Sequence, residues 1–202
     1  MKTSFSMKKR TAFIGVILSL TSILQALFIK KVIFLPTAGL VISFPLIVKA
    51  ETADFYIDRA EVKFNNKDYY GAISDYKTAL EINPSSVFAL SRLGRSKYYL
   101  KDYKGALKIL NQAVNINANY KFSFVLRGDV KFALGDYYGA ISDYSKSIKI
   151  DSKDFFPYYF RGLAKKKIGD SYGACSDMRF SLDLSTNNQA TNILNNWIKN
   201  YC

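Results

Sequence analysis

Three small groups of residues in this sequence have side chains that could do chemistry. The first group pairs arginines with aspartates sixteen residues later: Arg59 with Asp75, Arg127 with Asp143, and Arg161 with Asp177. The other two groups are the basic run of Lys165, Lys166 and Lys167 and the cysteine pair of Cys175 and Cys202. The 202-residue chain contains no histidine, so the commonest general base and metal ligand is absent.

The arginine–aspartate pairs allow a functional and a structural interpretation. The arginines could bind an anion, or the aspartates could act as catalytic acids or bases. At the corresponding positions of one further segment, both residues are apolar, namely Leu93 and Ile109. Because the two positions change together, we expect them to touch, one on each of two helices. An ion pair that can be exchanged for an apolar pair is typical of a partly buried structural contact.

The remaining features give no support to an active site. The sequence has no glycine-rich phosphate loop, no nucleophile elbow and no histidine for a catalytic triad. Two cysteines without histidine do not make a four-ligand zinc site. We therefore expect no enzymatic activity, no cofactor, no metal site and no small-molecule substrate.

The net charge of +13 is unevenly distributed along the chain. Residues 1–50 contain seven of the 29 basic residues and no acidic residue, so the rest of the chain has a net charge of only +6. The lysine run at 165–167 lacks a flanking basic stripe, which favours a solvated helix face over a nucleic-acid contact. No nucleic-acid partner is predicted.

Residues 1–50 have the features of a signal peptide or a membrane anchor. Uncharged apolar runs cover residues 11–29 and 32–48, and Val48-Lys49-Ala50 has the small residues of a cleavage site. Three interpretations are open: a cleaved export signal, an uncleaved anchor, and a two-helix hairpin. Lys30 and Lys31 disfavour the hairpin, because basic residues favour the cytoplasmic side of a membrane. Export is therefore favoured.

Residues 51–202 contain one unit that occurs four times at a constant spacing. The units follow one another without a gap and cover residues 53–86, 87–120, 121–154 and 155–188. Each contains two amphipathic stretches joined by a short polar turn, which predicts two helices per unit. An aspartate is placed to cap each second helix: Asp68, Asp102, Asp136 and Asp170. A glycine and an alanine then follow and are expected to let the helices pack closely: Gly71–Ala72, Gly105–Ala106, Gly139–Ala140 and Gly173–Ala174.

The unit resembles the tetratricopeptide repeat. The small residue of this family's first helix corresponds to Ala60, Gly94, Gly128 and Gly162. The large residue of its second helix corresponds to Tyr76, Leu110, Tyr144 and Met178. The motif D-Y-x-G-A-I-S-D-Y, at 68–76 and 136–144, is similar to bacterial, including cyanobacterial, repeats of the family. The resemblance implies an all-α fold, an α-solenoid of four helix-turn-helix repeats that presents a concave surface to a partner.

The last segment, residues 189–202, is predicted to be a capping helix. Its apolar residues fall on one helical face, and a solenoid needs its last apolar face covered. Trp197 is therefore expected to be a core residue. Cys175 in the last repeat and Cys202 at the end of this helix are expected to form a disulfide if the domain is exported. They are expected to remain free thiols if it is cytoplasmic.

The resemblance also implies which residues line the concave surface. In this family, that surface is lined by first-helix residues that point away from the core. The corresponding positions here give a partner-binding groove of mostly aromatic and charged residues: Phe88, Arg92, Arg95, Tyr98, Phe122, Val125, Asp129, Phe132, Phe156 and Tyr159. The family's carboxylate clamp for chaperone tails is not expected, because the Lys, Asn and Arg positions of the clamp are occupied by Ile57, Glu61, Arg92, Phe122 and Leu126.

Two functions from different classes are predicted from these features. The favoured one is a protein–protein interaction scaffold, exported to a compartment such as the periplasm or tethered to the membrane. It would bind a peptide or helix of a partner, preferably an apolar segment bearing an acidic residue. The alternative is a membrane-anchored structural or assembly subunit that retains its apolar N-terminus. The phenylalanines also have a competing interpretation, in which they pack between neighbouring helices.

Overall fold

The computed structural model describes residues 52–186 and 188–202. The predicted signal or anchor segment, residues 1–50, lies outside the described residues. Within the part that is described, no helix is both long enough and apolar enough to cross a membrane.

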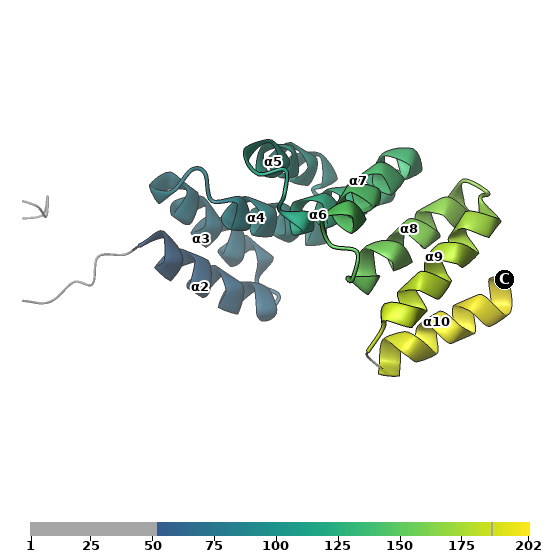
Figure 1. Cartoon of the computed structure of the whole chain (residues 1–202). Coiled ribbons are helices and arrows are strands. Elements are labelled where there is room, and N and C mark those ends of the chain that lie inside the picture. The colour runs from purple at the N-terminus through teal and green to yellow at the C-terminus, as the bar shows by residue number, and fades with distance from the viewer. Residues whose placement is uncertain (1–51, 187) are drawn as a thin grey trace, which may run out of the picture. The chain divides into compact units, whose positions relative to one another are not determined.

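The described residues form nine α-helices and no β-strand, which confirms the predicted all-α fold. Eight helices form four consecutive pairs (Figure 1). The first helices of the pairs are α2 (Ala53–Asn65), α4 (Val87–Tyr99), α6 (Lys121–Ala133) and α8 (Phe155–Lys167). The second helices are α3 (Tyr69–Ile82), α5 (Tyr103–Ile116), α7 (Tyr137–Ile150) and α9 (Ser171–Leu184). Each helix packs against the next one along the chain, and α4, α6 and α8 also contact one another in turn, as in a solenoid.

Each second helix begins at an aspartate cap. The Asp68 carboxylate accepts a hydrogen bond of 2.9 Å from the backbone N–H of Gly71. Three equivalent pairs repeat this cap: Asp102 with Gly105, Asp136 with Gly139, and Asp170 with Gly173. The cap satisfies one of the backbone donors that the first turn of a helix leaves free.

The glycines after these caps have a different role from the expected one. A Cβ atom on Gly71 would lie 2.0 Å from Oδ2 of Asp68, and the other three glycines face their own caps in the same way. The prediction that these glycines let helices pack closely is therefore wrong, because the capping carboxylate occupies the space. Helix packing involves the next residue instead, since all four of these alanines are fully buried: Ala72, Ala106, Ala140 and Ala174.

Within each repeat, a small residue of the first helix packs against a large buried residue of the second. A Cβ on Gly128 would lie 2.6 Å from Cε1 of Tyr144, and one on Gly94 would lie 2.7 Å from Cγ of Leu110. Tyr144 and Leu110 are themselves almost fully buried. In repeats two and three, the two helices therefore approach closely enough that a side chain at the small position would collide with the other helix, while repeat one accommodates only the methyl group of Ala60.

The three arginine–aspartate pairs join the two helices of repeats one, three and four. Their guanidinium–carboxylate distances are 2.8 Å for Arg59–Asp75, 2.6 Å for Arg127–Asp143 and 2.6 Å for Arg161–Asp177. A lysine one turn after each arginine contacts the other carboxylate oxygen: Lys63, Lys131 and Lys165. The aspartates are buried, and the Arg59 hydrogen bond is the main cause of the lowered pKa of Asp75.

Repeat two replaces the arginine and the aspartate of this polar cluster. Leu93 is buried where the other repeats have arginine, and Ile109 is half-buried where they have aspartate. The lysine of the cluster is present as Lys97, but it turns instead to the helix cap Asp102. Lys97, the one charged residue of this cluster that repeat two keeps, therefore still has a partner.

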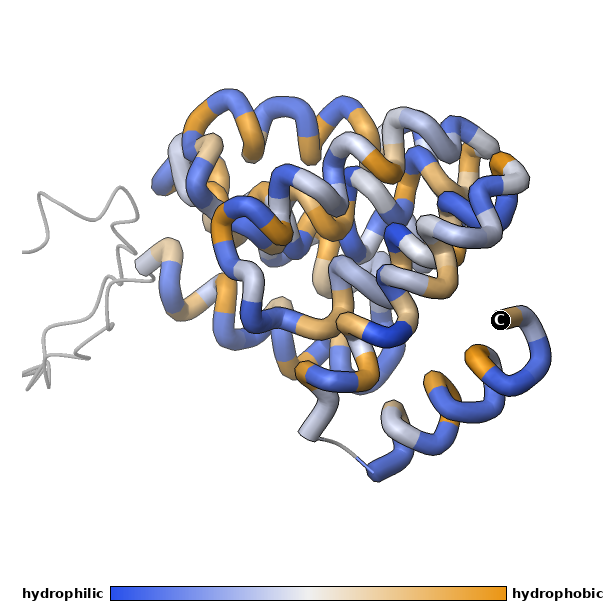
Figure 2. Tube along the Cα trace, turned by 45° about the vertical axis from the view of Figure 1, so that its right-hand side comes forward, coloured by the Kyte–Doolittle hydropathy of each residue, from blue (hydrophilic) through white to orange (hydrophobic). Residues whose placement is uncertain are grey.

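Helix α10 (Asn188–Tyr201) packs on α9 and covers the end of the solenoid. Figure 2 shows the hydrophobic positions of α10 along one side of the helix. Leu194 is fully buried, while Trp197 and Ile198 are half-buried and Ile193 remains half exposed. Trp197, expected in the core, thus lies at the edge of the contact, with the Lys166 ammonium 5.0 Å from the centre of its ring.

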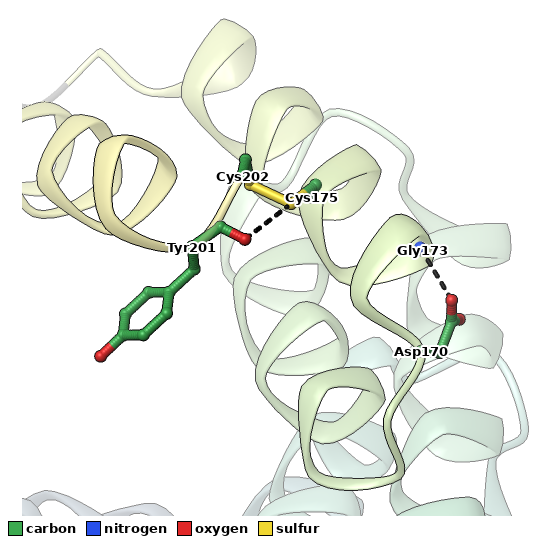
Figure 3. Close-up of a disulfide and its surroundings, with 5 residues drawn as sticks. All are labelled: Asp170, Gly173, Cys175, Tyr201 and Cys202. Carbon is green, nitrogen blue, oxygen red and sulfur yellow. Dashed lines mark hydrogen bonds between the residues drawn. A yellow bond between two sulfur atoms is a disulfide. The ribbon is translucent and has the colours of Figure 1, made fainter.

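A disulfide joins α9 to the end of α10. Cys175 and Cys202 have their Sγ atoms 2.11 Å apart and their Cα atoms 5.7 Å apart (Figure 3). The Cys175 sulfur also lies 3.6 Å from the carbonyl oxygen of Tyr201. Closing a loop with a sequence separation of 27 residues contributes about 3–4 kcal/mol in the chain-entropy model.

The apolar pair of repeat two can be introduced into repeat three by substituting Arg127 and Asp143. We expect Asp143→Ile alone to lower the free energy of unfolding by about 3–5 kcal/mol, because Arg127 and Lys131 lose their buried partner. Adding Arg127→Leu should restore most of this loss, since Lys131 can turn to Asp136 as Lys97 turns to Asp102. Urea unfolding of the two variants measures the difference. A double variant as unstable as Asp143→Ile would contradict this account of the pair.

Candidate functional site

A cavity of about 330 Å³ lies on the first helices of repeats two, three and four. The constant spacing of the repeats brings equivalent positions of α4, α6 and α8 side by side, so their exposed residues face one shared space. We call this cavity the aromatic groove and define it by its lining residues: Phe88, Ser91, Arg92, Arg95, Tyr120, Phe122, Val125, Leu126, Asp154, Phe156 and Phe160.

Three phenylalanines form the exposed aromatic part of the groove. Phe88, Phe122 and Phe156 lie at the second position of α4, α6 and α8, and their exposed fractions are 36%, 51% and 52%. The Phe156 ring stacks on Phe155 with its centre 4.1 Å away. Large apolar side chains that stay exposed next to one another are typical of a surface that binds a partner.

The floor of the groove is closed by direct contact between α4 and α6. The hydroxyl oxygens of Ser91 and Ser123 are 2.8 Å apart and form a buried hydrogen bond between these helices. Val125 and Leu126 are half-buried beside it. The small serines let the two helices come close, which leaves the larger phenylalanines to line the opening.

Two arginines of α4 supply positive charge at one end of the groove. The guanidinium of Arg92 lies 3.2 Å from the carboxylate of Glu61 and over the ring of Phe88. Arg95 lies instead over the rings of Phe64 and Tyr99, 4.9 Å and 5.7 Å from their centres. In the described part of the chain, Arg95 forms neither an ion pair nor a hydrogen bond.

The negative charge at the other end already has a partner. The Asp154 carboxylate accepts hydrogen bonds from the Lys121 ammonium at 2.9 Å and from the backbone N–H of Phe156 at 3.1 Å. Lys121 also contacts Asp151, and its ammonium lies 5.1 Å from the centre of the Phe122 ring. Asp154 is therefore engaged as a helix cap and an ion-pair partner.

Of the ten residues predicted for the groove, six line this cavity: Phe88, Arg92, Arg95, Phe122, Val125 and Phe156. The other four lie elsewhere. Tyr98 packs into the core cluster around Leu110, and Phe132 packs against Tyr137 with ring centres 5.2 Å apart. Tyr159 makes an edge contact with Phe160, and Asp129 accepts a hydrogen bond of 2.8 Å from the Tyr144 hydroxyl.

Two lining residues come from the turns between repeats and were not predicted. Tyr120 and Asp154 directly precede α6 and α8, and Ser86 holds the same position before α4. The prediction considered only first-helix positions, so it passed over this column. The sequence did contain a signal for this column, because its residues recur at the repeat spacing: Ser86, Tyr120 and Asp154.

A second coordinated exchange in the repeats also escaped the sequence interpretation. The Tyr76 hydroxyl donates to Glu61 in repeat one, as that of Tyr144 does to Asp129 in repeat three. In repeat two, the tyrosine position is Leu110 and the acidic position is Arg95. In repeats one and three, an acidic residue thus accompanies the tyrosine hydroxyl, and in repeat two a basic residue accompanies the leucine. Repeat four has neither a hydroxyl nor a charge at these positions, which are Met178 and Leu163.

Asp129 is the carboxylate near the groove whose titration is most perturbed. Burial raises its pKa to about 6, although the Tyr144 hydrogen bond and the charge of Arg95 oppose this rise. Burial also raises the pKa of Tyr144 itself. No group of three or more metal-ligating side chains occurs among residues 52–186 and 188–202.

Comparisons with known proteins identify the repeated unit. Residues 53–86 match the family model described as tetratricopeptide repeat, and residues 128–169 match a second model described as TPR repeat. This chain is a tetratricopeptide repeat protein. A search of curated proteins finds no significant match to its sequence.

Solved structures share the fold of this tetratricopeptide repeat protein. The thermophilic repeat protein TTC0263 of Thermus thermophilus has a TM-score of 0.64 at 18% identity, covering 69% of this chain and 77% of its own. A crystal structure of MamA has a TM-score of 0.60 at 23% identity and 66% and 73% coverage. The first repeat domain of Spaghetti (RPAP3), bound to the HSP90 peptide SRMEEVD, has a TM-score of 0.57 at 20% identity and 59% and 94% coverage.

The raised pKa of Asp129 predicts a pH-dependent stability for this tetratricopeptide repeat protein. The folded chain holds the Asp129 proton more tightly than the unfolded chain does, so stability falls as the pH rises from about 4 to about 6. Asp129→Asn keeps an acceptor for Tyr144 without the buried charge. We expect it to raise the free energy of unfolding at pH 7.5 by about 1–3 kcal/mol, since one pKa unit corresponds to about 1.4 kcal/mol.

Urea unfolding at pH 4 and pH 7.5 measures this effect, and the gain should fade at pH 4. Asp143→Asn is the control, because removing a charge that Arg127 and Lys131 neutralise should destabilise the protein at pH 7.5. A loss of stability in Asp129→Asn at pH 7.5 would show that the carboxylate is needed in its charged form.

Proposed function

We propose that this protein is an interaction scaffold that binds a segment of another protein in the aromatic groove. The observation on which this proposal rests is the row of three half-exposed phenylalanines around one cavity, at equivalent positions of three repeats. Burying such aromatic side chains is the main source of affinity in protein interfaces. The peptide held by the related RPAP3 domain supports the same use of the fold here.

A scaffold also agrees better than an enzyme with the chemistry of the groove. The chain has no histidine, and the two carboxylates that flank Arg95 in its column accept hydrogen bonds from tyrosines. The tetratricopeptide repeat family consists in general of interaction scaffolds. We therefore propose a binding function without a catalytic step.

The compartment proposed for this scaffold lies outside the cytoplasm. Cys175 and Cys202 are joined in a disulfide near the surface, and such bonds persist mainly in oxidising compartments. The Val48-Lys49-Ala50 sequence ahead of the folded repeats supports removal of the leader during export. Retention of the leader would instead tether the scaffold to a membrane.

Binding in the groove is tested with a display library of random 12-residue peptides, selected on the full chain in mild detergent. We expect Phe122→Ala to weaken binding of the selected peptides by about 2 kcal/mol, which is roughly thirtyfold in Kd. The melting temperature of this variant should be nearly that of the wild-type protein. Phe124→Ala, on the same helix but 4% exposed, is the matched control and should lower the melting temperature instead. If Phe122→Ala lowers the melting temperature and spares binding, the phenylalanines are core residues.

The compartment is tested on protein isolated from its native cell under conditions that trap thiols. N-terminal sequencing should give a first residue of Glu51, and labelling without reduction should find no free thiol. An intact Met1 together with two labelled cysteines would place the repeats in the cytoplasm and overturn the export proposal.

A further inference from the structure

We propose that Arg95 binds an acidic side chain of the segment held in the aromatic groove, while an apolar neighbour of that side chain packs against Phe122 and Phe156. This inference rests on the proposed function, because it specifies the partner's chemistry at the same site. It follows from three observations on the charges of the groove.

The first observation is that Arg95 has no counter-charge in contact. Arg92 has Glu61 within 3.2 Å, and Asp154 has Lys121 within 2.9 Å. Arg95 lines the same cavity, yet no acceptor atom lies within bonding distance of its guanidinium anywhere in residues 52–186 and 188–202. Its five N–H donors are therefore available to an acceptor that comes from outside.

The second observation is that the two carboxylates nearest to Arg95 in its column already have hydrogen-bond donors. Glu61 and Asp129 occupy the same column in the adjacent repeats, where they accept hydrogen bonds from Tyr76 and Tyr144. Repeat two has Leu110 in place of that tyrosine, so an acidic residue at position 95 would have no hydroxyl donor. Repeat two therefore has a positive charge, Arg95, in the column where the adjacent repeats have carboxylates that are hydrogen-bonded to tyrosines.

The third observation is that the guanidinium is oriented before any partner arrives. It lies over the ring of Phe64, and the ring of Tyr99 stacks on Tyr69 at 5.0 Å beside it. An arginine that is already stacked loses less side-chain entropy on binding than a free one does. Arg95 is also half-buried, and a hydrogen bond to a charged acceptor is stronger there than in open water.

A single carboxylate fits this site better than a phosphate group. The planar guanidinium forms two parallel hydrogen bonds with a carboxylate. Phosphate recognition generally uses a cluster of arginines, and here the second arginine is already paired with Glu61. The phenylalanines on α6 and α8 require an apolar group a short distance from the acidic one, which a protein segment with Asp or Glu next to an apolar residue supplies.

The test uses a peptide selected from the display library, in which peptides are flanked by linkers and have no free terminus at the site. The synthetic peptide is capped at both ends, and each Asp or Glu is replaced in turn by Asn or Gln. We expect one replacement to weaken binding to the full-length protein by about ten- to a hundredfold, as for a lost charged hydrogen bond. The same replacement should have little effect on Arg95→Gln, because the two groups are coupled.

Two further variants separate a direct contact from a general charge effect. Lys108→Gln removes one positive charge from an exposed position of α5 and should leave affinity unchanged. Arg95→Lys keeps the charge but loses the planar fork, so it should recover only part of the affinity. The melting temperatures of all variants should match that of the wild-type protein.

The outcomes distinguish this inference from the function on which it rests. Peptides that depend on Phe122 but contain no acidic residue coupled to Arg95 would overturn the inference and leave the groove function standing. A library that yields no peptide sensitive to Phe122→Ala would overturn the groove function itself.

Discussion

The close approach of the two helices within each repeat is the constraint on which the rest of this structure depends. A large buried side chain of the second helix lies against a small residue of the first, as Tyr144 lies against Gly128 and Leu110 against Gly94. Because this contact fixes the geometry of each pair, an unbroken repeat spacing places α4, α6 and α8 in register. The three phenylalanines, which occupy equivalent positions of these helices, then line one cavity.

In repeats one to three, the large residue at this contact is matched by the charge next to it. A tyrosine brings a hydroxyl that needs an acceptor, and Glu61 and Asp129 provide one. A leucine brings none, and Arg95 is found there instead. In repeat two, the core residue Leu110 therefore goes together with Arg95, the positive charge that lines the aromatic groove. Core and binding surface are coupled within one repeat.

The sequence predicted the helices, their aspartate caps and the ion-pair partners of Arg59, Arg127 and Arg161. These features depend on contacts within one repeat, and the sequence shows that repeat four times. Roles that depend on three-dimensional detail could not be predicted in this way. Gly71 was assigned to helix packing, although the capping carboxylate of Asp68 occupies the space beside it. Tyr98 and Phe132 occupy first-helix positions like the groove residues, but they lie near the ends of α4 and α6 and pack into the core. The direction in which such side chains turn depends on the neighbouring repeat.

The disulfide makes the two ends of the repeat array unequal. Stability in a linear array is a sum of local contacts, so such a protein can begin to unfold from either end. Cys175 and Cys202 keep α10 attached to α9 even when the contact around Leu194 opens transiently, so that it closes again quickly. At the other end, α2 packs mainly on α3 and leaves Phe55 and Val62 exposed among the described residues. Local unfolding should therefore begin in repeat one more often than at the disulfide-bonded end. The groove, which is formed by repeats two to four, lies toward the disulfide-bonded end.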